Sequence, residues 1–236
     1  MPTYNEIGSL EATVERLMEL PLPGLHLKIV DDNSPDGTGE LAEKLAERHR
    51  QHGKPRISVL HRTAKDGLGR AYAAGMALAV EEGAHFVIQM DADGSHPASA
   101  VPQMIGTALS TGAGLVVGSR YVPGGELAEE WGWHRRLLSR WANAYAGTIL
   151  STRVRDITAG FNLWDRSTLD DVRLDSLESA GYSFQVELKY RAVRAGHVAV
   201  EIPIRFEERR AGASKMSFAV QLESALVPWR LRLRNR

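Results

Sequence analysis

The chain has 236 residues with 29 basic and 29 acidic side chains, so its formal net charge is zero. This length supports one substantial hydrophobic core, and the balanced charge excludes a global field that would attract nucleic acid, so we expect any anion site to be local. The absence of cysteine excludes disulfides, thiolate zinc sites and a cysteine nucleophile.

The first half of the chain alternates between helix-like and strand-like patterns. Apolar residues at helical spacing from Ile7 to Met18, with Asn5 as the expected N-cap, predict a helix, and an apolar strand follows at 27–30. The polar segment 31–37 ends this strand. The later predicted elements are a helix containing Leu41 and Leu45, strands at 57–60, 85–90 and 115–117, and helices at 70–81 and 99–109.

Segment 2–6 looks like a loop that leaves a strand, although no strand precedes it. Either the first strand is truncated or the sheet begins with the second strand, and the sequence leaves both open. The alternation predicts an α/β fold with a mostly parallel, Rossmann-like sheet flanked by helices. Ligands bind such sheets beyond the carboxyl ends of the strands, which is where six polar residues fall: Asp31, Asp32, Asp91, Asp93, Ser119 and Arg120.

Asp91 and Asp93 directly follow the apolar strand 85–90. Two carboxylates in this position can approach one cation, and hard oxygen ligands suit Mg²⁺ or Mn²⁺ bridged to substrate phosphates. An Asp-x-Asp loop alone is more often solvated surface. Its position after a buried strand favours a metal site.

Three other patterns have alternative interpretations. The segment 31–34 is typical of a turn or helix N-cap, or places one carboxylate against a base or ribose and leaves the other structural. The segment 65–70 opens a helix that either presents backbone N–H groups to a phosphate or is a plain glycine-rich helix start, and Gly67 and Gly69 lack the third glycine of a dinucleotide fingerprint. The histidines show no ligand spacing, and we expect His96 to be a hydrogen-bonding loop residue.

Several segments together resemble the dolichol- or polyprenol-phosphate mannosyltransferases, which are family 2 glycosyltransferases with the GT-A fold. The segments that carry this resemblance span most of the chain: 2–6, 30–38, 89–97, 118–121, 132–143, 156–161, 182–187 and 209–215.

The resemblance implies a role for each matching residue. The implied donor-binding residues are Pro2, Tyr4, Glu6, Val30, Asp32, Asp91, Ala92, Asp93, Gln185, Arg209 and Lys215. The implied metal ligands are Asp91, Asp93 and Ser95, and the implied acceptor-phosphate residues are Arg120, Arg135 and Ser139. The implied catalytic residues are Asp93, Arg120, Arg209 and Lys215.

The resemblance also implies inverting transfer of mannose from GDP-mannose to a polyprenyl monophosphate, with Mg²⁺ or Mn²⁺ as cofactor. A phosphate monoester has a second pKa of roughly 6, so the acceptor is already an anion near neutral pH and needs no general base. Two departures affect the metal loop. Ser95 stands where some relatives carry Gln, and Gly94 replaces a common Leu.

The C-terminal segment mixes apolar residues with Arg230, Arg232, Arg234 and Arg236. We expect a catalytic domain at 1–215 and an amphipathic basic helix at 216–236, which either lies on an anionic membrane surface or closes the domain by packing on it. No apolar run approaches the roughly 20 residues of a membrane span. The sequence therefore predicts a cytoplasmic protein, peripheral at the cytoplasmic face of the membrane, with the membrane or a membrane-anchoring protein as partner.

Other functions stay open at this stage. The same fold could use a UDP-sugar on a polyprenyl phosphate or a polysaccharide, because the motifs do not report the base or the sugar. A sugar-nucleotide sensor or a membrane scaffold would need no turnover. A nucleotidyltransferase would carry a glycine-rich basic loop near its first strand, where this chain has Asn5 and Glu6.

Overall fold

The computed structural model describes residues 1–51, 54–128, 131–177, 179, 181, 183–207 and 218–234. The predicted α/β class is confirmed, since helices flank two sheets that are mostly parallel. A three-stranded parallel sheet has the order β1 (Pro2–Thr3), β2 (Leu27–Asp31) and β5 (Ile57–His61). A four-stranded sheet has the order β10 (Ala199–Pro203), β7 (Leu115–Ser119), β9 (Asn162–Asp165) and β6 (Phe86–Gln89).

Strand β9 is the exception to the parallel pattern, because it runs antiparallel to both of its neighbours, β6 and β7. Two short pairs complete the strands: β3 (Arg50–Gln51) with β4 (Lys54–Pro55), and β8 (Glu126–Leu127) with β11 (Arg205–Phe206). The segment interpreted as a loop at 2–6 begins with strand β1, which pairs with β2 through Pro2 opposite Val30.

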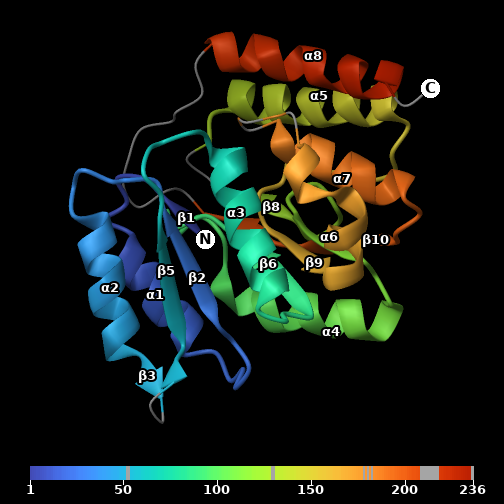
Figure 1. Ribbon diagram of the computed structural model, residues 1–236. Helices are drawn as coiled ribbons and strands as arrows, with labels where there is room; N and C mark the ends of the chain where they lie inside the picture. Colours follow the sequence, from blue (N-terminus) through green and yellow to red (C-terminus); the bar gives the residue numbers. More distant parts are fainter. Residues whose placement is uncertain are drawn as a thin grey trace.

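The helices are α1 (Leu10–Met18), α2 (Thr38–Arg48), α3 (Leu68–Glu81), α4 (Val101–Thr111), α5 (Trp133–Leu150), α6 (Arg166–Val172), α7 (Phe184–Arg194) and α8 (Phe218–Arg234). Single 3₁₀ turns span Ala98–Ala100 and Leu174–Ser176. In Figure 1, α1 and α2 lie on the outer side of the three-stranded sheet, whereas α5 and α8 form a separate layer along one edge of the molecule.

The start of the first helix differs from the prediction. Helix α1 begins at Leu10 with Ser9 at the N-cap, and Asn5 instead adopts a left-handed backbone with φ of 58°. Ile7 is exposed, because its backbone N–H donates to Asp36 in the turn after β2 and holds it outside the helix. Helical spacing alone did not reveal that this turn competes for Ile7.

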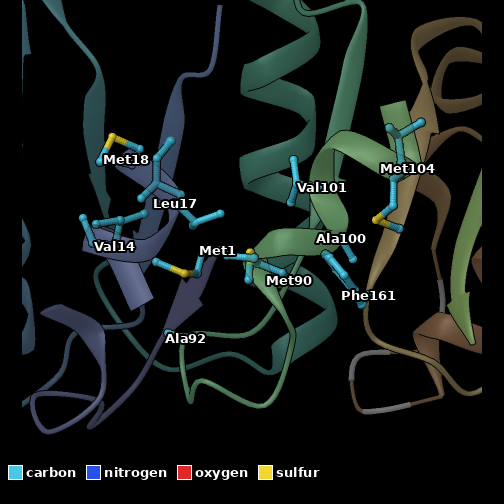
Figure 2. Close-up of a cluster of buried hydrophobic side chains, with 14 of the residues drawn as sticks. Met1, Val14, Leu17, Met18, Met90, Ala92, Ala100, Val101, Met104 and Phe161 are labelled. Carbon is cyan, nitrogen blue, oxygen red and sulfur yellow. The ribbon is translucent and has the colours of Figure 1, made fainter. Parts of the chain in front are cut away.

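One of the two core clusters supports the loop that follows β6. Met90 and Ala92 are buried in this cluster together with Val14 and Leu17 of α1 and Phe161, and Figure 2 shows Met90 between the side chains of α1 and Phe161. The hydroxyl of Thr13 donates to the backbone oxygen of Ala92 at 3.1 Å. The acidic loop is therefore anchored on α1 through its central residue.

Helix α8 packs on α5. The hydroxyl of Tyr145 donates to the backbone oxygen of Ala225 at 2.9 Å, and the indole of Trp229 donates to Tyr145 at 3.0 Å. Val227 and Leu231 are buried, while Leu226, Trp229 and Leu233 are exposed. The helix thus closes the domain with one face and presents an apolar face to the outside. The predicted boundary at 215–216 lies outside the described residues.

A cavity of about 630 Å³ lies between β2, β6 and α3 and is lined mostly by apolar side chains such as Leu27, Met76 and Ile88. Its described lining includes Pro2 and Val30 of the predicted nucleoside pocket as well as Tyr72, but neither Asp91 nor Asp93. Within the described part of the chain, no helix is both long and apolar enough to cross a membrane.

Candidate active site

The acidic loop after β6 holds both predicted metal-binding carboxylates. Oδ1 of Asp93 accepts hydrogen bonds from the backbone N–H of Ser95 at 3.0 Å and from its hydroxyl at 2.6 Å. Both residues are buried. Ser95 therefore orients the Asp93 carboxylate in this structure, and its assignment as a third metal ligand stays a prediction.

Asp91 is held through its backbone and its side chain. Its N–H donates to Nδ1 of His96 at 3.0 Å, which confirms His96 as a hydrogen-bonding loop residue. Its Oδ1 accepts a 2.5 Å hydrogen bond from the hydroxyl of Tyr72 on α3. Burial, followed by the negative charge of Asp91, raises the pKa of Tyr72 well above its usual value, so this hydroxyl is a permanent donor.

The two carboxylates at the end of β2, Asp31 and Asp32, have different partners. Asp31 accepts hydrogen bonds from the hydroxyls of Thr3 and Ser34, at 2.9 and 2.6 Å, so it is the structural member. Asp32 pairs with Arg62. Burial raises the pKa of Asp32 despite this cation. Asp32 is the carboxylate of the two that faces other charged groups.

The other residues assigned to the nucleoside pocket cluster around β1. Pro2 and Val30 are partners in the β1–β2 register. The side chain of Tyr4 lies under the ammonium of Lys65, 3.8 Å from the ring centroid. The carboxylate of Glu6 accepts a hydrogen bond from the hydroxyl of Ser9 at 3.0 Å. These contacts bring the predicted residues to one end of the three-stranded sheet.

Arg120 follows β7 and forms a buried ion pair with Asp156, which the sequence analysis did not single out. Nε and Nη2 of Arg120 donate to the two carboxylate oxygens at 2.8 and 2.7 Å, and its backbone N–H donates at 2.9 Å. Burial opposes both charges, but their attraction outweighs it, so the pKa of Asp156 is lowered and that of Arg120 is raised. None of the described residues accepts a hydrogen bond from Nη1 of Arg120.

Of the two predicted acceptor residues on α5, Ser139 is connected to Arg120 through Tyr121. The hydroxyl of Tyr121 donates to that of Ser139 at 2.6 Å, and the guanidinium of Arg120 lies 5.4 Å from the Tyr121 ring. The guanidinium of Arg135 stacks on Trp131 at 3.7 Å. Because Tyr121 follows Arg120 directly, the tyrosine links the end of β7 to α5.

Gln185, assigned to the donor site, belongs to a buried amide cluster. Nδ2 of Asn162 donates to Oε1 of Gln185 at 3.3 Å, to Oε1 of Gln89 at 3.1 Å and to the backbone oxygen of Ala159 at 3.1 Å. The cluster ties α7, β6 and the segment 156–160 together. The predicted Arg209 and Lys215 lie outside the described residues.

Lys189 on α7 is a second buried charged residue that the sequence analysis missed, because it sits in an otherwise ordinary helical pattern. Its ammonium donates to the backbone oxygen of Ala159 at 2.6 Å. Burial lowers the pKa of Lys189 to about 7.

We predict a pH dependence of stability from Lys189. Its pKa is near 7 in the folded state and about 10.4 in an unfolded chain, so above pH 7 the unfolded chain binds a proton that the native state has lost. The unfolding free energy should then rise by up to about 1.4 kcal/mol per pH unit between pH 7 and about 10. Urea titrations at pH 7.5 and 9 should show a smaller rise for Lys189→Met, and equal rises would contradict the assignment.

The acidic loop suits a hard divalent cation. Asp91 and Asp93 offer carboxylate oxygens, each with Oδ1 held by a neighbouring hydroxyl. Among the described residues, no three His, Asp or Glu side chains gather as a complete protein-made cage. This donor set fits Mg²⁺ or Mn²⁺, which are commonly held by one or two carboxylates together with substrate phosphates.

Comparison with known proteins places the chain in a family. The model described as Glycosyl transferase family 2 matches residues 1–173. Polyprenol monophosphomannose synthase of Mycolicibacterium smegmatis is 43% identical over 217 residues, which are 92% of this chain and 79% of that protein. Undecaprenyl-phosphate mannosyltransferase of Micrococcus luteus is 43% identical over 226 residues, 96% of this chain and 89% of that protein.

Solved structures support the fold. Glucosyl-3-phosphoglycerate synthase from Mycobacterium tuberculosis, in complex with Mn²⁺, UDP-glucose and phosphoglyceric acid, matches with a TM-score of 0.67 and 18% identity over 96% of this chain and 77% of that chain. A second structure of that synthase, with phosphoglyceric acid, gives a TM-score of 0.68. The sequence and structural matches agree, and the chain belongs to glycosyl transferase family 2, as a glycosyltransferase with the GT-A fold.

Proposed function

We propose that the enzyme transfers mannose from GDP-mannose to a polyprenyl monophosphate with inversion at the sugar carbon. The observation that carries the proposal is the acidic loop, in which Asp91 and Asp93 are each held through Oδ1 by a hydroxyl. The two curated relatives, both at 43% identity, bear names that specify mannose and a polyprenyl or undecaprenyl phosphate. The names of the relatives and the carboxylate pair, which suits a divalent cation, both support this reaction.

Each group of residues has a role in this reaction. Pro2, Tyr4, Glu6, Val30 and Asp32 bind the nucleoside, and Ala92 and Gln185 lie along the donor. Asp91 and Asp93 would hold Mg²⁺ or Mn²⁺ with Ser95 as the third ligand, and the bound cation would neutralise charge on the diphosphate. Arg209 and Lys215 are assigned to the leaving diphosphate.

The acceptor brings its own nucleophile. Arg120, Arg135 and Ser139 orient the acceptor phosphate, one of whose oxygens attacks the anomeric carbon. The bond from that carbon to the diphosphate oxygen breaks with its electron pair, and GDP leaves. Because the phosphate oxygen is already anionic, no side chain has to accept a proton. A single displacement gives a β-linked polyprenyl-phosphate mannose.

The layer of α5 and α8 suits a membrane surface, where a polyprenyl phosphate resides. Exposed apolar side chains gather on both helices: Trp133, Leu137, Leu138, Trp141, Leu226, Trp229 and Leu233. Figure 1 shows the two helices side by side. Arg135 and Arg140 on α5 and Arg230 and Arg234 on α8 add positive charge. Exposed aromatic and apolar groups with nearby arginines favour an anionic interface, and we propose that this layer faces the cytoplasmic leaflet.

We expect Trp133→Ser combined with Leu137→Ser to weaken binding to vesicles of phosphatidylglycerol and phosphatidylethanolamine by at least about tenfold. Burial of one large apolar side chain contributes about 1.5–3 kcal/mol, and 1.4 kcal/mol is a factor of ten. Co-sedimentation measures the partition. The control is Leu109→Ser on α4, which is 70% exposed and outside this layer. Equal losses in both variants would contradict a membrane face on α5.

The test of function uses radiolabelled sugar donors. The full chain is incubated with GDP-mannose or UDP-glucose, Mn²⁺ and a short polyprenyl phosphate, and label is measured in the organic phase. We expect label from GDP-mannose. Label from UDP-glucose alone would replace the donor assignment by a UDP-sugar, and label from neither donor would refute polyprenyl-phosphate glycosylation and leave a sensor, a scaffold or another acceptor.

A further inference from the structure

Tyr72 lies behind the acidic loop and belongs to none of the residue groups assigned to substrate. It comes from α3, is 3% exposed, and stacks on Phe184 of α7 with ring centroids 5.3 Å apart. Its hydroxyl donates to Oδ1 of Asp91 at 2.5 Å. A tyrosine of the hydrophobic core therefore donates a hydrogen bond to a carboxylate of the proposed metal site.

The two oxygens of Asp91 have different surroundings. Oδ1 is occupied by Tyr72, whereas none of the described residues donates a hydrogen bond to Oδ2. A Cβ placed on Gly160 would lie 3.5 Å from Oδ2 and 3.4 Å from His96. Gly160 therefore places no side chain against Oδ2. The backbone of Asp91 is also fixed, through its N–H bond to His96.

Asp93 also has its Oδ1 held by a hydroxyl, but from a different kind of partner. Its Oδ1 accepts the hydroxyl of Ser95 at 2.6 Å. Ser95 is local in sequence and lies within the loop itself. Tyr72, by contrast, reaches Asp91 from a helix nineteen positions earlier in the chain. Each carboxylate thus has one oxygen held by a hydroxyl, and the hydroxyl that holds Asp91 comes from the buried face of α3.

We propose that Tyr72 is a positioning residue for the divalent cation, holding Oδ1 of Asp91 so that Oδ2 is presented to the ion. The inference rests on the proposed metal-dependent function and names a residue that acts through Asp91. Hydrogen-bond partners of metal-binding side chains fix the orientation of the ligand, and their loss typically weakens metal affinity by about 10–100-fold.

The test is Tyr72→Phe, which removes the hydroxyl and retains the ring that packs on Phe184. Mn²⁺ binding to the full chain in the presence of GDP is measured by electron paramagnetic resonance. We expect binding to weaken by about 10–100-fold. In transfer assays the concentration of Mn²⁺ for half-maximal rate should rise by a similar factor, while kcat at saturating Mn²⁺ stays close to that of the unmodified enzyme.

Tyr190→Phe is the matched control. Tyr190 is buried in the same core cluster, and its hydroxyl donates to none of the described residues. Its removal should leave Mn²⁺ binding unchanged. Should Tyr72→Phe fail to fold, Tyr72→Gln and Tyr72→Leu form a second pair of similar size, in which only Gln retains a donor, and Gln should bind Mn²⁺ more tightly.

Three outcomes decide the proposal. Unchanged Mn²⁺ affinity in Tyr72→Phe, or equal affinity in the Gln and Leu variants, would overturn it. In an Asp91→Ala background, Tyr72→Phe should have no further effect on residual Mn²⁺ binding, because residues that act as a pair are not additive; an additive loss would also overturn it. Failure of mannose transfer with a normal Tyr72 effect on Mn²⁺ binding would refute only the proposed function.

Discussion

Replacement of Asp93 by Asn is expected to reduce mannosyl transfer by roughly a thousandfold or more. A bound metal supplies several kcal/mol of stabilisation to the developing charge, and each 1.4 kcal/mol is a factor of ten in rate. The substitution is isosteric, and the Asn oxygen can still accept the two hydrogen bonds that Ser95 donates to Oδ1 of Asp93. The loop should keep its shape and lose one carboxylate charge.

Asp165 provides a matched control for Asp93→Asn, because its carboxylate has the same kind of hydrogen-bond partner. Asp165 accepts hydrogen bonds from the N–H and hydroxyl of Ser167, at 2.9 and 2.5 Å, just as Asp93 does from Ser95. It stands opposite Phe86, at the start of β6 rather than beyond its end. Asp165→Asn should therefore retain near-normal transfer. Activity of Asp93→Asn within tenfold of the unmodified enzyme, at matched melting temperature, would contradict a metal-binding role.

Replacement of Asp156 by Asn is expected to give the largest loss of stability, about 3–5 kcal/mol in the unfolding free energy. Removal of one member of a buried ion pair leaves the other charge uncompensated in the interior. Asp156 is fully buried and Arg120 nearly so. Urea unfolding monitored by circular dichroism measures the change. Since the same bonds orient Arg120, transfer to the acceptor phosphate should fall as well.

Asp66→Asn is the surface counterpart of this test. Asp66 pairs with Arg70 on an exposed part of α3 and its preceding loop, and exposed pairs contribute about 0–1 kcal/mol.

The pKa of Asp156 is lowered in the folded state, so its contribution is present above the unfolded pKa of about 3.9 and is lost as pH falls through the folded pKa. The deficit of Asp156→Asn should therefore shrink in acid, and a deficit that is constant with pH would contradict the ion-pair explanation.

The local pattern of the sequence predicted much of the site's scaffold. The strands 27–30, 57–60, 85–90 and 115–117 correspond to β2, β5, β6 and β7 of the structure. Polar residues after these strands, among them Asp32, Asp93 and Arg120, fall at their carboxyl ends because parallel strands share one direction. The family followed from motifs distributed over most of the chain.

The second half of the chain was less predictable. Strand β9 is antiparallel between two parallel strands, and its pairing depends on residues more than 40 positions away. Helix α8 has an apolar face on each side, one against α5 and one exposed, so its sequence was equally consistent with packing and with an interfacial position. The position of α5 in the fold decides which of the two faces is buried and which is exposed.

The sequence by itself determined the family, the α/β class and the acidic loop of Asp91 and Asp93, because these depend on short segments and on the order of strands. Only the tertiary structure decided which partner each charged group takes. The sequence assigned no role to Asp156, Lys189 or Tyr72, and their roles arise because distant segments bring them to Arg120, Ala159 and Asp91. In a buried environment such partners determine the charge state and orientation of a polar side chain. The positions of the two residues along the chain do not reveal that they are in contact.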